Sequence, residues 1–199
     1  MMMDLISYAA VVLLVVSSLV LLVSQNWRIS ILALAVLYLG AFWLVSLQWP
    51  LGLAAAKLVV GWMAGAVLGA SQPASQPASM DDLYEDRPSG FSGPVFRLIA
   101  AGLVGVLVIS ILPLLEGRFP GSAPALWGGA LLVGMGLLHL GMTTRPLRVV
   151  LGLLTLLSGF EILYASVEVS VLVAGLQAVL TLGLALVGAY LLAAPSMES

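Results

Sequence analysis

The chain has 199 residues, of which 62% are hydrophobic and only 8% are charged. Soluble domains contain about 25% charged residues, so this composition leaves too little polar surface for a water-soluble fold and predicts an integral membrane protein. The net charge of −2 gives no reason to expect a nucleic-acid partner. Without cysteine, and with His139 as the single histidine, the chain lacks the ligand sets of thiolate metal sites and iron–sulfur clusters, so we expect no metal and no cofactor.

A transmembrane helix requires about 20 consecutive apolar residues, and seven runs in this sequence approach that length. They are Leu5–Val23, Ile29–Leu47, Leu51–Ala70, Val95–Leu115, Ala123–Met142, Arg148–Val167 and Val169–Leu192. Because the apolar residues are continuous rather than alternating, the pattern favours an all-α membrane fold. Pro50 directly precedes the third run and Pro146 precedes the sixth, where a missing N–H at a helix start does no harm.

Between the third and fourth runs the composition changes. Residues 71–90 read SQPASQPASMDDLYEDRPSG, a tandem SQPA repeat followed by an acidic cluster. Such a segment buries too little apolar surface to become ordered, so we expect a flexible cytoplasmic linker over 71–94, with DDLYED as a candidate partner-binding segment. The linker divides the chain into an N-terminal three-helix unit, residues 1–70, and a C-terminal four-helix unit, residues 95–199.

The arginines predict the orientation of the chain in the membrane. With seven spans, Arg118 falls near one face, and the other arginines fall near the opposite face: Arg28, Arg87, Arg97, Arg145 and Arg148. Cytoplasmic loops carry an excess of Lys and Arg. We therefore predict an inner-membrane protein with its N-terminus outside and with its C-terminus and 71–94 loop in the cytoplasm. Arg28, Arg97, Arg145 and Arg148 are the expected anchors at the cytoplasmic face.

A weak internal repeat relates the two halves of the chain. Lys57 follows Arg28 by 29 residues, and Gln177 follows Arg148 by the same 29 residues. In this register the first three spans match the last three. Identity is otherwise thin, but the topology fits two parallel three-helix units joined by the fourth span, an organisation found in transporters.

Lys57, Glu161 and Gln177 lie within apolar runs, each roughly 9–12 Å from the predicted outer interface at 1.5 Å per residue. Charged side chains near a bilayer centre cost about 2.5–3.5 kcal/mol on insertion scales. Three interpretations remain open for Lys57 and Glu161: a proton or ion path, a structural ion pair, or separate snorkelling to the interface. His139 is a further proton-path candidate near the cytoplasmic end of its span, although the sequence favours an interfacial or hydrogen-bonding role for it.

The small residues and tryptophans have simpler interpretations. Gly128, Gly129, Gly134 and Gly136 predict a close helix interface within this protein or with a neighbour. Some of the tryptophans are candidate anchors at the membrane interface. These candidates are Trp43, Trp49, Trp62 and Trp127.

The stretch RPLRVVLGLLTLLSGFEILYASVEVSVLVAGLQAVLTLGLALVGAYLL, from Arg145, resembles the NuoK/MrpC-type subunits of respiratory complex I and related antiporters. An arginine opens the penultimate span, and Gly159–Leu163 is similar to the GLEIM string of that family. The longer layout resembles the HyfE family, the elongated NuoK relatives of membrane-bound hydrogenases, through Arg28, Ser30 and Lys57. The NuoK-like part covers about residues 123–192.

This resemblance implies a non-catalytic membrane subunit, without a redox centre of its own, in a complex I-like or hydrogenase-like assembly that translocates protons or another ion beside antiporter-like subunits. In that family, a Glu in each of the last two spans serves proton translocation. Glu161 matches the first by its local string, although it lies further from Arg148 than the family spacing. The second falls near Gln177, an amide that does not titrate, so the relay is incomplete and the resemblance implies a mainly structural relative. The alternative is a self-contained small seven-helix transporter or membrane scaffold.

Overall fold

A computed structural model describes residues 2–72, 93–118 and 120–193 of the chain. Within these residues, each predicted span forms one helix, with boundaries within three residues of those predicted. The helices are α1 Met2–Val23, α2 Trp27–Ser46, α3 Leu51–Ala70, α5 Pro94–Glu116, α6 Ala123–Gly141, α7 Pro146–Ala165 and α8 Val171–Ala193. Each is long and apolar enough to cross a membrane, which makes this an all-helical integral membrane protein.

Local sequence explains where several helices begin. The Asn26 side chain accepts a hydrogen bond from the Arg28 backbone N–H at 3.0 Å, which caps α2. Pro50 is the residue before α3, and Pro146 is the first residue of α7, both as predicted. These prolines set the chain direction without removing a hydrogen bond that the helix needs.

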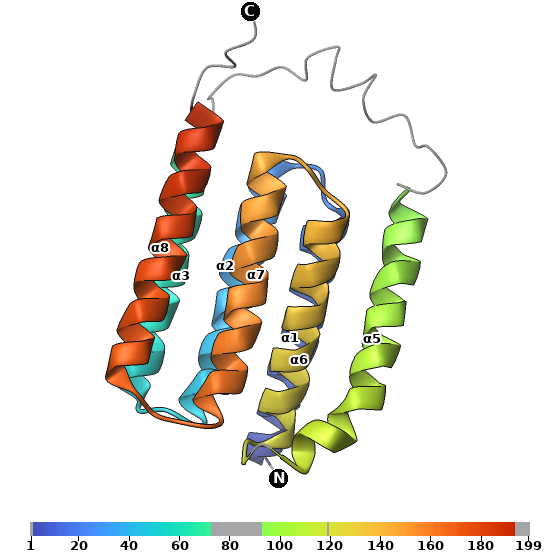
Figure 1. Ribbon diagram of the computed structural model, residues 1–199, viewed down its shortest axis with the longest axis vertical. Helices are drawn as coiled ribbons and strands as arrows, with labels where there is room; N and C mark the ends of the chain where they lie inside the picture. The colour runs from blue at the N-terminus through green and yellow to red at the C-terminus, as the bar shows by residue number, and fades with distance from the viewer. Residues whose placement is uncertain (1, 73–92, 119, 194–199) are drawn as a thin grey trace, which may run out of the picture.

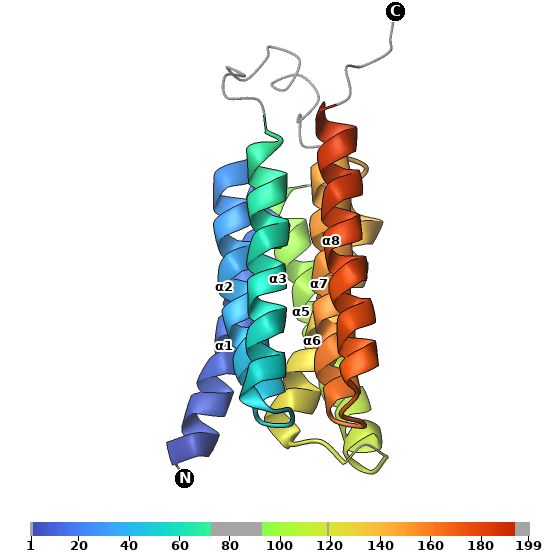
Figure 2. The same cartoon turned by 90° about the vertical axis from the view of Figure 1, so that its left-hand side faces the viewer.

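The helices form two facing layers (Figures 1 and 2). α1, α2 and α3 are consecutive neighbours in one layer, and α6, α7 and α8 are consecutive neighbours in the other. Across the layers α1 contacts α6, α2 contacts α7 and α3 contacts α8, while α5 lies at the edge of the bundle against α6 and α1. The core between the layers is rich in fully buried leucines, among them Leu14, Leu34, Leu37, Leu44, Leu132, Leu151 and Leu154.

Glycines bring α6 and α7 into backbone contact. A Cβ on Gly136 would lie 2.6 Å from the backbone nitrogen of Leu156, and a Cβ on Gly159 would lie 2.6 Å from that of Val133. A larger residue at either position would force the two helices apart. The predicted close interface therefore exists within the chain, since Gly128, Gly129, Gly134 and Gly136 all approach atoms of other helices.

The two ends of the bundle differ in charge. The end at which α1, α3, α6 and α8 finish carries four arginines, and we call it the positive end: Arg28, Arg97, Arg145 and Arg148. Arg118 follows α5 at the opposite end. The predicted linker over 71–94 connects α3 to α5 at the positive end and lies mostly outside the described residues, which include only 71–72 and 93–94 of it.

Candidate functional site

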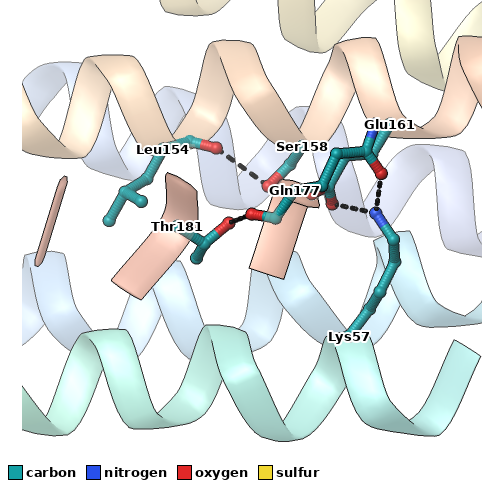
Figure 3. A network of polar contacts seen from close by, with 6 residues as sticks. All are labelled: Lys57, Leu154, Ser158, Glu161, Gln177 and Thr181. Atoms are coloured by element: carbon teal, nitrogen blue, oxygen red, sulfur yellow. Dashed lines mark hydrogen bonds and ion pairs between the residues drawn. The ribbon is translucent and has the colours of Figure 1, made fainter. Parts of the chain in front are cut away.

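Three polar side chains from three helices meet inside the bundle (Figure 3). Lys57 on α3 lies between Glu161 on α7 and Gln177 on α8. Its Nζ is 2.8 Å from Glu161 Oε2 and donates a hydrogen bond to Gln177 Oε1 at 2.6 Å. The three residues at similar predicted depth are therefore in direct contact, and we call them the charged cluster.

All three members of the charged cluster are buried. Lys57 is 9% exposed, Glu161 7% and Gln177 3%. The lysine therefore does not snorkel to the interface, because its ammonium group is enclosed by side chains of α7 and α8. Of the interpretations left open by the sequence, separate snorkelling is wrong, while the observed contact is compatible with both an ion path and a structural ion pair.

Hydroxyl groups extend the polar region from the charged cluster toward the middle of the bundle. The Ser158 hydroxyl, one helical turn from Glu161 on α7, donates to the Leu154 carbonyl at 2.8 Å. The Thr181 hydroxyl on α8 donates to the Gln177 carbonyl at 2.9 Å. Because each donor is satisfied within its own helix, the hydroxyl oxygens remain able to accept hydrogen bonds.

Tyr38 brings a third hydroxyl to this region from α2. The residue is 4% exposed, and its side chain lies beside Ser158 and Thr181. Its ring packs directly against the α carbon of Gly61 on α3, where a Cβ would overlap the ring. Gly61 is thus the residue that gives the tyrosine room between α2 and α3.

Trp49 covers the charged cluster on the side of the α2–α3 turn. The Lys57 ammonium lies 5.4 Å from the centroid of the Trp49 ring, a cation–π distance. The indole Nε1–H donates to the backbone carbonyl of Glu168 at 3.1 Å, in the connection between α7 and α8. Trp49 is 3% exposed, so this candidate interface anchor instead ties the two turns together over the lysine.

His139 does not belong to the charged cluster. It is buried on α6 beside Gly152, which precedes Glu161 by nine residues, or about 14 Å along α7. Its Nε2 has no hydrogen-bond partner within the described part of the chain. The charges close enough to act on it are those of Arg97 and Arg148, so the histidine is part of the positive end.

The arginine anchors lie at the positive end, but they make different contacts. The guanidinium of Arg97 donates to the Leu22 carbonyl at 3.2 Å, and that of Arg148 donates to the Ser24 carbonyl at 3.0 Å. Both satisfy carbonyl groups at the end of α1. Arg28 lies over the ring of Trp27, 5.2 Å from its centroid, and Arg145 is exposed.

The charged cluster combines two groups that can exchange protons with one that cannot. The 2.8 Å separation between Lys57 Nζ and Glu161 Oε2 is within the range for direct proton transfer. Gln177 supplies an acceptor for the ammonium group, while its own Nε2 is buried and unpartnered among the described residues. Buried polar groups usually have a partner, so this amide nitrogen is an unused donor beside an ion pair.

The sequence predicted a similar depth for the three members of the charged cluster, but it left their contact open and gave no role to the residues around them. Ser158 precedes Glu161 by three residues and Thr181 follows Gln177 by four, so helical spacing alone places each on the same face as its cluster member. Tyr38 gave no comparable signal, because its position beside Ser158 depends on which faces of α2 and α7 meet.

A scan against protein-family models and searches of curated proteins and solved structures find no match to this chain.

Proposed function

We propose that this chain is a membrane subunit, without a redox centre of its own, of a multisubunit complex that translocates protons or another ion. The proposed complex is similar to complex I-like and membrane-bound hydrogenase-like assemblies, and the chain packs in it beside antiporter-like subunits. The observation that carries the proposal is the buried charged cluster, in which Lys57 contacts both Glu161 and Gln177.

The cost of burying these charges supports a functional role. Each charge within a membrane span costs about 2.5–3.5 kcal/mol on insertion scales, and intramembrane ionisable residues mark ion and proton pathways. Replacing a buried ion pair by a hydrophobic pair of similar volume is often neutral or stabilising. Close packing of the helices therefore does not by itself explain why the residues at positions 57 and 161 are charged. A role in which one of these groups changes its charge during turnover does explain it.

The chemistry of the cluster suits a role within a larger relay. When Glu161 gains a proton, Lys57 loses its counter-charge and its contacts with the described residues are to neutral groups: the carboxyl of Glu161, the carbonyl of Gln177 and the ring of Trp49. The position of the ammonium group is thus coupled to the protonation of one carboxylate. Because Gln177 does not titrate, the described cluster holds one carboxylate, and the proposal assigns the remaining proton-transfer groups to neighbouring subunits.

The exposed helix faces leave room for neighbouring subunits. Only 17% of the α5 span and 28% of the α8 span are buried within the chain. Lipid or the helices of other subunits cover such faces in a membrane. We place the positive end in the cytoplasm of an inner-membrane protein, because Lys and Arg are enriched in cytoplasmic loops.

The proposal includes an origin by internal duplication, with α1–α3 and α6–α8 as two parallel three-helix units joined by α5. Positions 120 residues apart meet in two places. Lys57 contacts Gln177, and a Cβ on Gly188 would lie 3.0 Å from a methyl group of Leu68. If the two halves of homologous chains aligned no better than unrelated apolar helices, the duplication would be rejected.

The test is ion translocation by the complex isolated through a tag on this chain and reconstituted in liposomes. We expect Glu161→Gln to reduce the ions moved per turnover severalfold. The double variant Lys57→Met with Glu161→Gln removes both charges together, so it should assemble normally and still translocate poorly. Gly52→Ala, an exposed position at the start of α3 with open space around it, is the control and should behave as wild type.

Two results would reject the proposal. One is wild-type translocation by the double variant, which would assign the cluster a purely structural role. The other is ion flux through liposomes that contain this chain alone, which would favour a self-contained transporter.

A further inference from the structure

A second polar site lies at the positive end, away from the charged cluster. Arg97 opens onto a pocket of about 340 Å³ that is also lined by Val23, Gln25 and Pro94. The pocket lies between the end of α1 and the start of α5. Within the described residues, Arg97 makes one hydrogen bond, from Nη1 to the Leu22 carbonyl, so most of the five N–H donors of its guanidinium remain for another acceptor.

A separate apolar groove lies next to this pocket, about one helical turn further into the membrane. It has a volume of about 270 Å³ and lies between α1, α5 and α6. Its lining residues are Val15, Ser18, Leu19, Leu98, Ala101, Gly102, Gly105, Leu131 and Met135. Leu19 is one turn from Val23 on α1, and Ala101 is one turn from Arg97 on α5. Pocket and groove therefore share the same faces of both helices.

The geometry points to a binding site for an anionic phospholipid, with the phosphate at Arg97 and one acyl chain in the groove. The layout matches an amphiphile, because a cation stands at the polar boundary and apolar side chains line the space below it. From Arg97 to Gly105 the groove runs about 12 Å along α5, which is most of the ~15 Å hydrocarbon depth of one leaflet.

The charge around the pocket favours an anionic head group. Arg148 lies at the same end of α1 as Arg97, and both guanidinium groups act on His139. Basic pockets between helix ends are typical binding sites for anionic lipids. A second copy of the chain or a partner helix is a poor occupant, because a helix about 10 Å across does not enter a groove of this volume.

The floor of the groove is open space rather than a helix contact. A Cβ added at Gly102 or Gly105 would meet no atom within 4 Å. A side chain at position 105 can therefore extend into the groove without a clash at its Cβ, and it lies about two helical turns from the Arg97–Leu22 hydrogen bond. Gly183 on α8 is equally open and equally half-buried, away from the groove, which makes it the matched control.

The test is native mass spectrometry of the full chain in mild detergent, titrated with phosphatidylglycerol or with phosphatidylcholine of identical chains. We expect the wild type to prefer phosphatidylglycerol. Arg97→Gln should lower its affinity about tenfold, the equivalent of one charge-assisted hydrogen bond, while Arg145→Gln should not. Gly105→Leu should weaken binding of both lipids, and Gly183→Leu should leave both unchanged.

Several outcomes would overturn the inference. Equal binding of the two lipids, or wild-type binding by both Arg97→Gln and Gly105→Leu, would remove the site. Displacement of the lipid by glycerol 3-phosphate at equal concentration would indicate a soluble-anion site. Loss of a co-purifying protein instead of a lipid in these variants would assign the groove to a protein partner. The inference is independent of the proposed function, because it involves other helices and the isolated chain.

Discussion

Glu161→Ala tests whether the charged cluster holds the bundle together through its ion pair. At 2.8 Å and an effective dielectric constant of about 20, the gross attraction between the charges is about 6 kcal/mol, and desolvation offsets much of it. Removing one partner of a buried pair usually costs about 3–5 kcal/mol, because the other charge is left unpaired. The hydrogen bond from Lys57 to Gln177 remains and offsets about 1.5 kcal/mol of this cost, so we expect a net loss of about 1.5–3.5 kcal/mol.

The double variant Lys57→Met with Glu161→Gln leaves no unpaired charge. Its stability should return to within about 1 kcal/mol of wild type, because apolar replacements of buried ion pairs are often neutral. The assay is reversible unfolding in mixed micelles of a mild detergent and dodecyl sulfate, followed by circular dichroism of the helices. Arg145→Met, an exposed charge, is the control and should change stability by less than about 0.5 kcal/mol. Equal stability of wild type, Glu161→Ala and the double variant would refute the pairing.

Three further predictions address the packing of α6 against α7, the role of Trp49 over the charged cluster, and the orientation of the chain in the membrane. Gly159→Ala should lower the free energy of unfolding by about 2 kcal/mol, because the added Cβ meets backbone atoms of α6. The control Gly175→Ala should be neutral or slightly stabilising. Equal effects of the two variants in the same unfolding assay would contradict the close α6–α7 contact. Trp49→Phe keeps the ring over the lysine but loses the hydrogen bond to the α7–α8 connection, and should cost about 1 kcal/mol in that assay, so an unchanged unfolding curve would argue against this role. Because the chain has no cysteine, the single variants Arg145→Cys and Arg118→Cys can be labelled selectively with an impermeant maleimide. Arg145→Cys should react only from the cytoplasmic side, and Arg118→Cys only from outside. The reverse pattern would invert the proposed topology.

Much of the fold could be predicted because the membrane simplifies the problem. In a bilayer, each apolar run must form a complete helix to satisfy its backbone, so run length alone located α1 to α8 within three residues. The rise per residue then placed Lys57, Glu161 and Gln177 at similar depth. That depth is a one-dimensional property, and the sequence carries it directly.

Adjacency could not be predicted, because it depends on the order in which the helices pack. Nothing in the apolar pattern states that α3 contacts α8 or that α2 contacts α7. For this reason, the sequence left the Lys57–Glu161 pair open and gave no role to Tyr38. Trp49 was one of four candidate interface anchors, because tryptophans are enriched at span ends. In the structure it is buried where the α2–α3 turn meets the α7–α8 connection.

The central claim is that this chain functions as a subunit of a larger membrane complex. The most direct test is to purify the tagged chain from its native membranes in mild detergent and to quantify by mass spectrometry the proteins that accompany it. The proposal predicts antiporter-like membrane subunits, together with hydrogenase-type or quinone-reductase-type subunits, in fixed ratio to this chain. A chain that purifies alone or only with copies of itself would contradict the claim.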